Sequence, residues 1–380
     1  MAKQKQSETS ERGDDHAAES RLPAVILASG ITLVAVLAFG LFATISNPAA
    51  TDVPADADVI AGEWAARYQA SYEAGLLIQE PATHLWALFR YALFGEGRDG
   101  VLVGDDGWLF TTEEFAYYPG EEERIERWIE YVEAVRDALA ERDIELVIAL
   151  VPAKARLYQS RLGRYHYPDY AQDRADRFRQ AVRDLGIGVP VLDEALAETA
   201  SQADHFLRTD THWSPDGALA VARALEPSIS AALADQGSPR TSFDHTRGPE
   251  ETLEGDLLTF LPLGPFSERF GPEPDRIRPI EISEGQAEDS STGLFEEVVI
   301  PITLVGTSYS AGERWDFASA IKSVVDADVL NVATEGEGPF IPMAEWLTSE
   351  AIEESTPDVV VWEIPERYLP VEYEVSLPGE

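Results

Sequence analysis

The sequence has no cysteine among its 380 residues. Disulfides and thiolate metal sites are therefore excluded, because both need the cysteine sulfur. A chain without cysteine fits a bacterial protein that is exported from the cytoplasm, although export does not follow from the absence alone. No residue pattern in the sequence predicts a cofactor.

Positive charge is also scarce. The chain has 29 Lys and Arg residues against 69 Asp and Glu residues, which gives a formal net charge of -40. Like charges repel, so nucleic acid and anionic lipid head groups are not expected as partners. The acidic residues are interleaved with regular apolar runs, and 44% of the residues are hydrophobic, so the acidity does not indicate disorder. Such acidity is typical of solubility in a salt-rich habitat and says little about mechanism.

One long apolar run stands near the N-terminus, at residues 22–45. Its length suits a membrane span, which needs about 20 apolar residues, whereas the apolar region of a cleaved signal peptide has about 7–15. Basic residues precede the run and none follows it before Arg67, so the positive-inside rule places residues 1–21 in the cytoplasm and the rest outside. We expect an uncleaved signal anchor, with cleavage near Ala49 as the alternative. The preceding basic residues are Lys3, Lys5, Arg12 and Arg21.

The composition of the exported part changes along the chain. Residues 46–95 begin as a stalk rich in Pro, Ala and Asp and continue as a helical lead-in. Residues 96–370 alternate apolar strand runs with amphipathic helices, which is typical of one α/β domain. Within this domain, residues 236–294 are rich in Pro, Gly, Ser and acidic residues, and we expect a loop-rich excursion there.

The alternation predicts a mostly parallel sheet that helices cover on both sides. An early hairpin is expected around Asp106-Gly107, a strong two-residue turn signal. Ser214 is the predicted N-cap of a helix that starts at Pro215, and Ser310 is predicted to open another helix through a capping box. The expected strands are 144–151, 189–192, 298–305, 327–332 and 358–362, and the expected helices are 121–142, 171–185, 194–206, 215–225 and 311–324.

Two short segments supply the side chains of a serine nucleophile system. Asp210-Thr211-His212-Trp213 provides a carboxylate and an imidazole, and Gly306-Thr307-Ser308-Tyr309 provides a hydroxyl. Ser308 stands between a predicted strand and a predicted helix, where unpaired backbone N–H groups suit a developing oxyanion. A serine hydroxyl needs a base, for which His212 is the candidate. In an extended segment, Asp210 lies on the same face as His212 and can orient the imidazole.

Each part of this set also has a simpler interpretation. Asp210 can cap backbone N–H groups locally, and a serine in the position of Ser308 is often only a turn residue. His212 and Asp210 can both bind a metal, but two ligands do not make a metal site. No metal site is therefore predicted, and the residues alone leave the catalytic and the structural interpretation open.

An ordered set of sequence blocks resembles the alginate O-acetylation proteins, which belong to the SGNH-hydrolase-like superfamily. The resemblance covers residues 95–370, and each block is weak by itself, but the common order of the blocks is specific. The blocks are Gly104–Phe110, Val151–Tyr158, Asp210–Trp213, Gly255–Leu257 and Gly306–Tyr309.

The resemblance implies a three-layer SGNH-hydrolase-like fold and a triad of Ser308, His212 and Asp210. It implies an enzyme that moves acetyl groups onto hydroxyls of alginate or an alginate-like exopolysaccharide. Such enzymes work in the periplasm, beside a membrane-bound O-acyltransferase that brings acetyl across the membrane. The chain is similar to the single-domain members, because little sequence follows Arg367 that could form a carbohydrate-binding domain. We therefore expect a single-pass inner-membrane protein with its catalytic domain in the periplasm.

Further residues are candidates for contact with the polysaccharide. Lys154 and Arg156 are positive residues after a predicted strand, and they can bind uronate carboxylates. Local ion pairs with the many acidic residues are the alternative. Tyr309 and Trp213, together with Trp315, can stack on sugar rings, but they fit a hydrophobic core equally well.

Three functions compete for this sequence. The first is a polysaccharide O-acetyltransferase that works through an acetyl-serine intermediate. The second is a polysaccharide acetylesterase with the same triad, which differs only in the use of water as acceptor. The third is a non-catalytic component of an acetylation or export complex, against which the presence of Asp210, His212 and Ser308 argues, since a scaffold needs none of them.

Overall fold

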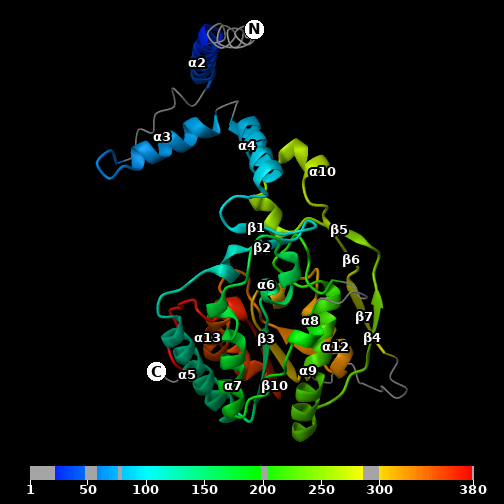
Figure 1. The fold of residues 1–380 in the computed structure, drawn as a ribbon. Helices are drawn as coiled ribbons and strands as arrows, with labels where there is room; N and C mark the ends of the chain where they lie inside the picture. Colours follow the sequence, from blue (N-terminus) through cyan, green and yellow to red (C-terminus); the bar gives the residue numbers. More distant parts are fainter. Residues whose placement is uncertain (1–21, 48–57, 76–78, 198–203, 286–298, 379–380) are drawn as a thin grey trace, which may run out of the picture. The chain divides into compact units, whose positions relative to one another are not determined.

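The computed structural model describes residues 22–47, 58–75, 79–197, 204–285 and 299–378 (Figure 1). The predicted cytoplasmic tail at 1–21 and much of the predicted stalk, at 48–57, lie outside the described residues. The chain divides into two units, residues 1–86 and residues 87–380. The second unit contains the whole of the predicted catalytic domain.

The described part of the first unit is helical. It contains α2 (Leu22–Ile45) and α3 (Glu63–Ala74), and α4 (Gln79–Phe94) begins in it. The side chains of residues 22–29 are not among the described ones. Within the described part of the chain, no helix is both long enough and apolar enough to cross a membrane.

A four-stranded parallel sheet organises the second unit, with the strand order β3-β10-β8-β9. Four of the five predicted strands are confirmed by it. The predicted strand at 189–192 is wrong: Gly188 bridges to Val147 of β3, but no strand follows, and Pro190 lacks the N–H that a ladder needs. The strands are β3 (Glu145–Val151), β10 (Val359–Pro365), β8 (Ile302–Val305) and β9 (Val329–Asn331).

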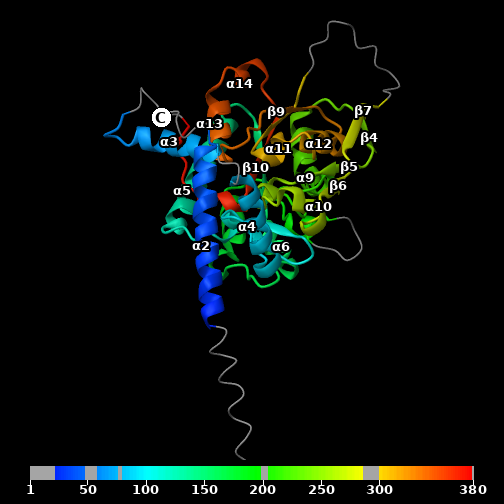
Figure 2. The ribbon, with the colours of Figure 1, turned by 90° about the horizontal axis from the view of Figure 1, so that it is seen from above.

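Helices cover both faces of this sheet, in three layers (Figure 1, Figure 2). Successive side chains of β10 point to opposite faces of the sheet. Val361 packs in the core on one face, and Trp362 packs in the core on the other. This arrangement confirms the predicted three-layer α/β fold with a parallel sheet. One face carries α9 (Pro215–Gln236) and α12 (Phe317–Val325), and the other carries α5 (Glu121–Ala140), α7 (Arg174–Asp184) and α13 (Phe340–Thr348).

Helix α9 begins as predicted. Ser214 Oγ accepts the backbone N–H of Gly217 at 3.2 Å, and Pro215 takes the first helical position. The helix continues past its predicted end to Gln236, because buried side chains recur along it as far as Leu233.

Two helix predictions are wrong. In place of a helix at 194–206 the structure has one turn, α8 (Asp193–Leu196), and described residues 204–206 are not helical; residues 198–203 lie outside the described residues. The capping box at Ser310 does not open a helix either. A short helix, α11 (Ser308–Ala311), starts before it, and α12 starts after Asp316, whose carboxylate accepts the N–H of Ser319 at 3.1 Å.

The predicted hairpin is confirmed, because β1 (Val101–Val103) pairs antiparallel with β2 (Leu109–Thr111). Asp106 and Gly107 both have positive φ, 53° and 79°, as the turn favoured by Asp-Gly requires. Shorter helices of the second unit include η2 (Thr112–Phe115), α6 (Lys154–Leu157), η3 (Gln159–Arg161), η4 (Asp169–Ala171), η6 (Gly264–Phe266), α10 (Ser267–Phe270), α14 (Ala351–Glu354) and η7 (Glu366–Tyr368).

The excursion at 236–294 folds, over its described part up to residue 285, as two antiparallel strand pairs. After β5 the chain turns through η5 (Asp256–Phe260), which brings Asp256 to the candidate site. The region therefore contains more regular structure than its composition indicated. β4 (Phe243–Arg247) pairs with β7 (Ile280–Glu284), and β5 (Glu251–Leu253) pairs with β6 (Asp275–Ile277).

Candidate active site

Ser308 is the first residue of α11, directly after the buried strand β8. The side chain of Thr307 accepts the backbone N–H of Tyr309 at 3.3 Å and so caps this helix. At the first position of a helix, the backbone N–H has no acceptor within the helix. Ser308 is half-buried, so its side chain stays partly open to solvent.

A buried carboxyl group holds this turn in place. Glu363 of β10 accepts the backbone N–H of Thr307 at 2.7 Å, and it accepts the hydroxyls of Thr307 and Ser310 at 3.0 and 3.1 Å. Burial raises the pKa of Glu363 to about 7, although these hydrogen bonds and Arg367 act in the opposite direction. A Cβ on Gly306 would lie 2.6 Å from Glu363 Oε2, so a side chain there would push the turn away from the carboxyl group.

Asp210 and His212 lie on a tight loop and not on an extended strand, which corrects the expectation from the sequence. A bridge joins Phe206 to Trp213, and the backbone N–H of Leu207 donates to the carbonyl of His212 at 3.1 Å. We call residues 207–212 the acid–base loop. The two side chains meet because Asp210 Oδ1 accepts the backbone N–H of His212 at 2.9 Å, a turn that aspartate favours.

The three candidate side chains form a continuous chain of hydrogen bonds. Asp210 Oδ1 lies 2.6 Å from His212 Nδ1, and His212 Nε2 lies 2.7 Å from Ser308 Oγ. An ionised carboxylate can only accept, so the shared proton belongs on Nδ1, and the lone pair of Nε2 faces the serine hydroxyl. The local capping role and the orienting role of Asp210 are therefore compatible, since the same carboxylate accepts a backbone N–H and orients the imidazole.

The environment of Asp210 favours its charged form. Burial raises its pKa, but the hydrogen bond and charge of His212, together with the backbone N–H groups of Asp256 and His212, outweigh burial and leave the pKa of Asp210 below its ordinary value. The group therefore remains ionised at neutral pH. A carboxylate in this position stabilises an imidazolium that forms at His212.

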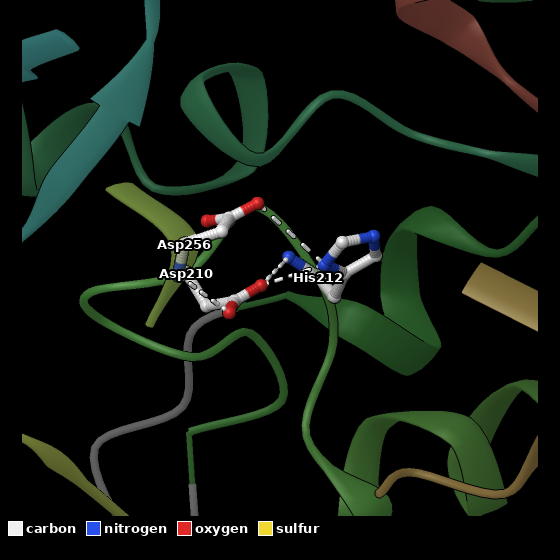
Figure 3. Close-up of side chains that lie close together, drawn as sticks. All are labelled: Asp210, His212 and Asp256. Atoms are coloured by element: carbon white, nitrogen blue, oxygen red, sulfur yellow. Dashed lines mark hydrogen bonds and ion pairs between the residues drawn. The ribbon is translucent and has the colours of Figure 1, made fainter. Parts of the chain in front are cut away.

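Asp256 supports the acid–base loop from the excursion. Its backbone N–H donates to Asp210 Oδ2 at 2.9 Å, its Oδ1 accepts the backbone N–H of Thr211 at 2.8 Å, and its Oδ2 accepts the Thr211 hydroxyl. Gly255 permits this approach, because a Cβ there would collide with the Thr209 carbonyl. Figure 3 shows both carboxylates on one side of the imidazole, with the second ring nitrogen pointing away from them.

Asp210, His212 and Asp256 also bring three ligand atoms within 4.8 Å of one another, as a metal site would. Their hydrogen bonds indicate a different use. Nδ1 lies 2.6 Å from the Asp210 carboxylate, so it carries a proton and offers no lone pair to a metal. The Asp256 oxygens accept the backbone N–H and the hydroxyl of Thr211. The donor set therefore fits an acid–base pair better than a metal centre.

Two aromatic rings hold the imidazole of His212. The indole of Trp315 stacks on it, with ring centroids 4.3 Å apart and an interplanar angle of 17°. Trp315 Nε1 also donates to the Ser308 carbonyl at 3.2 Å, so this ring contacts both the imidazole and the serine. The Tyr309 ring centroid lies 4.8 Å from the imidazole, and its hydroxyl donates to the Thr211 carbonyl at 2.6 Å.

Lys154 supports the acid–base loop and does not face solvent. Only 1% of its surface is exposed, and its ammonium donates to the carbonyls of Leu109, Arg208 and Asp210 at 2.6, 3.1 and 2.9 Å. Burial lowers the pKa of Lys154 to about 8, although nearby carboxylates act in the opposite direction. All three donors of the ammonium are engaged, which leaves none for a uronate. The expected substrate contact is thus replaced by a contact within the protein.

The other expected substrate contacts are also turned inward. Arg156 forms ion pairs with Asp193 and Glu366 at 2.5 and 2.9 Å, which is the alternative considered from the sequence. Trp213 is fully buried and Tyr309 is 2% exposed, and both belong to the core beneath α9 and α12. These positions fit core packing and leave little surface for a sugar ring.

Sequence reasoning gave no role to Asp256 or Glu363. The Gly255–Leu257 block contained a signal for Asp256, since glycine suits positions where the backbone makes a close approach. Glu363 is the single acidic residue of the otherwise apolar β10. A carboxyl group in a buried strand needs partners, and this one finds them in the serine turn.

A comparison with protein families matches residues 101–366 to the SGNH hydrolase-like domain of the acetyltransferase AlgX. The chain belongs to this family. The probable alginate O-acetylase AlgJ of Pseudomonas aeruginosa is 39% identical over 361 residues, which cover 93% of this chain and 90% of that protein. AlgJ of Azotobacter vinelandii, also described as a probable alginate O-acetylase, is 39% identical over 322 residues, which cover 84% and 82%.

Solved structures of the same family agree. The O-acetyltransferase domain of Pseudomonas putida AlgJ superposes with a TM-score of 0.64 at 36% identity, and the match covers 73% of this chain and 94% of that one. Pseudomonas aeruginosa AlgX superposes with a TM-score of 0.56 at 21% identity, over 72% and 63%, which concerns the fold alone. The chain is therefore an enzyme, an O-acyltransferase of the SGNH-like family, as the sequence predicted.

Proposed function

We propose that this acetyltransferase moves acetyl groups onto hydroxyls of alginate, or of an alginate-like exopolysaccharide, with Ser308 as nucleophile. The observation that carries the chemistry is the 2.7 Å contact between Ser308 Oγ and His212 Nε2, in line with the 2.6 Å contact between His212 and Asp210. The choice of polymer rests on the relatives, which are described as probable alginate O-acetylases at 39% identity over most of their length.

In the first half-reaction, Ser308 Oγ attacks the carbonyl carbon of an acetyl donor while His212 Nε2 takes the hydroxyl proton. Asp210 stabilises the imidazolium that results. The backbone N–H of Ser308, at the first position of α11, is available to the oxyanion. The tetrahedral intermediate then collapses, His212 gives its proton to the departing group, and the acetyl group remains on Ser308 as an ester.

In the second half-reaction, a sugar hydroxyl takes the place of the departed group. His212 Nε2 removes its proton as the sugar oxygen attacks the acetyl carbonyl carbon. The Ser308 oxygen leaves and regains a proton from His212. The products are an acetylated polysaccharide and the free enzyme, and water in place of the sugar would give the esterase reaction.

We also propose the cellular setting that the sequence predicts. Residues 22–45 anchor the chain in the inner membrane, and the catalytic domain lies in the periplasm. The support is the apolar run, with basic residues before it and none after it until Arg67. A membrane-bound O-acyltransferase would then supply acetyl from the cytoplasmic side. A reporter enzyme that works only in the periplasm, fused after residue 380, should be active in this orientation and silent in the opposite one.

The chemistry can be tested by intact-mass analysis of the full-length chain after incubation with p-nitrophenyl acetate. We expect a single acetyl adduct that maps to Ser308. The variants Ser308→Ala and His212→Ala should acquire none. Ser267→Ala is the control, because Ser267 is an exposed serine of α10 that has no contact with the serine turn or the acid–base loop, and this variant should keep the adduct.

Addition of mannuronate oligomers to the acetylated enzyme separates the two candidate reactions. Acetyl recovered on the oligomer supports transfer, whereas release only as acetate supports the esterase. A well-folded protein that acquires no adduct and turns over no ester would refute the proposed triad.

A further inference from the structure

A groove of about 470 Å³ lies against both stems of the acid–base loop. One wall is formed by Asp204 and Phe206 before the loop, by Leu207 and Arg208 at its start, and by residues 214–216 after it. The excursion provides the other wall, through Arg247 on β4 and residues 275–278 on and after β6. Asp275 joins the two walls, because its carboxylate accepts the backbone N–H groups of Arg208 and Thr209, both at 2.8 Å. Anything bound in the groove therefore lies beside the loop that carries Asp210.

The groove is much less acidic than the chain as a whole. Arg208, Arg247, Arg276 and Arg278 line it, together with the carboxylates of Asp204, Asp216, Glu250 and Asp275. Positive and negative side chains are thus equal in number there, whereas the whole chain has 29 basic residues against 69 acidic ones. A polyanion that the rest of the surface repels would meet the least repulsion in this groove.

One of the four carboxylates is buried, whereas two of the four arginines are largely exposed. The Asp275 side chain is only 6% exposed, and its oxygens accept from the backbone and from the Thr209 hydroxyl at 2.6 Å. Arg276 and Arg278 are 74% and 62% exposed, and they share one carboxylate, Glu250, at 3.1 and 4.0 Å. Two guanidinium groups on one carboxylate leave several N–H donors for a ligand.

The spacing of these two arginines suits a polymer. Arg276 and Arg278 alternate with the buried residues Asp275 and Ile277, so their side chains leave the same face of the chain. Alternate residues of an extended segment stand about 6.6 Å apart. A guanidinium fork matches the two oxygens of a carboxylate, and a pair of forks matches carboxylates that repeat along a chain.

We propose that this groove binds the carboxylates of a polyuronate acceptor, with Arg276 and Arg278 as the main contacts. The inference rests on the proposed function, in which the acceptor is an alginate-like polymer, and adds the surface that holds that acceptor. Neutral glycans have no carboxylates for the two arginines to bind. Contact with uronate carboxylates, which the sequence suggested for Lys154 and Arg156, is thus assigned to Arg276 and Arg278 of the excursion.

Binding is measured on the full-length chain with Ser308→Ala, so that no acetyl transfer occurs. This protein is titrated with a mannuronate oligomer and with a neutral oligosaccharide of equal length. The test variant adds Arg276→Gln and Arg278→Gln. The control variant adds Arg127→Gln and Arg177→Gln, which remove two exposed, ion-paired arginines of α5 and α7.

We expect the Kd for the mannuronate oligomer to rise about tenfold in the test variant, which corresponds to about 1.4 kcal/mol. The control variant should have the same Kd as the parent protein. Added salt should weaken binding of the oligomer to the parent protein more than binding to the test variant. Equal Kd values in the test and control variants would overturn the proposal, and so would a parent protein that binds the neutral oligosaccharide as tightly. Ester turnover by the protein with Ser308 intact tests the proposed chemistry separately, because it needs no polymer.

Discussion

The substitution Glu363→Gln tests whether the carboxyl group behind the serine turn titrates near neutral pH. Glu363 is fully buried in β10, and it accepts hydrogen bonds from the backbone and hydroxyl of Thr307 and from the hydroxyl of Ser310. Glutamine has the same shape and keeps one carbonyl oxygen for these donors, but it has no proton to lose. The variant therefore removes the titration while it preserves most of the packing.

The size of the effect follows from the raised pKa. The unfolded chain releases this proton near pH 4.5 and the folded protein only near pH 7, so the folded state binds more protons between these values. The free energy of unfolding of the wild type therefore falls as pH rises through this window. At about 1.4 kcal/mol for each pKa unit, the loss contributed by Glu363 amounts to about 3 kcal/mol.

Urea unfolding of both proteins, from about pH 4.5 to about pH 8, measures this contribution. The difference between the wild type and Glu363→Gln cancels the other titrating groups, which the two proteins share. We expect the wild type to lose about 3 kcal/mol relative to the variant over this range. Glu126→Gln, at an exposed position of α5, is the matched control and should follow the wild type. Parallel curves for the wild type and Glu363→Gln would show that burial does not raise this pKa, and the reasoning would fail.

Three further changes test the supports of the acid–base loop and of the serine turn. Asp256→Asn removes a charge 3.9 Å from His212 Nδ1, and we expect kcat for p-nitrophenyl acetate to fall about tenfold with little change in the urea midpoint. Lys154→Met leaves three buried carbonyls without their donor and should lower the free energy of unfolding by about 3 kcal/mol, measured from urea curves. Gly306→Ala places a methyl group against Glu363; we expect at least a tenfold loss of ester turnover, with the circular dichroism spectrum unchanged.

The sequence predicted which side chains meet at the candidate site because short segments carry them. Asp210 and His212 are close in sequence, and local turn chemistry brings them together wherever the loop lies. The contact between His212 and Ser308 spans 96 positions, and no local pattern predicts it. The resemblance to a family with the same block order supplied that contact.

The errors have a common physical origin in tertiary contacts. A lysine in an acidic sequence suggests a surface position, but Lys154 is buried because three backbone carbonyls, from β2 and the acid–base loop, converge on its ammonium. The capping box at Ser310 obeys local rules, yet Glu363 binds the Ser310 hydroxyl and removes it from that role. Among these errors, only the strand wrongly predicted at 189–192 could have been avoided from the local sequence, because Pro190 cannot donate a ladder hydrogen bond.

The excursion is attached to the acid–base loop at two points, Asp256 and Asp275, which stand after β5 and at the start of β6. The chain between them includes an exposed stretch, residues 267–270. Insertions in that stretch leave both attachments in place, whereas loss of either side-chain acceptor leaves backbone N–H groups of the loop without their partners. In a scan of all substitutions and insertions, we therefore expect residues 267–270 to be permissive, and we expect intolerance at the two aspartates and at the buried Leu257, Leu261 and Leu263.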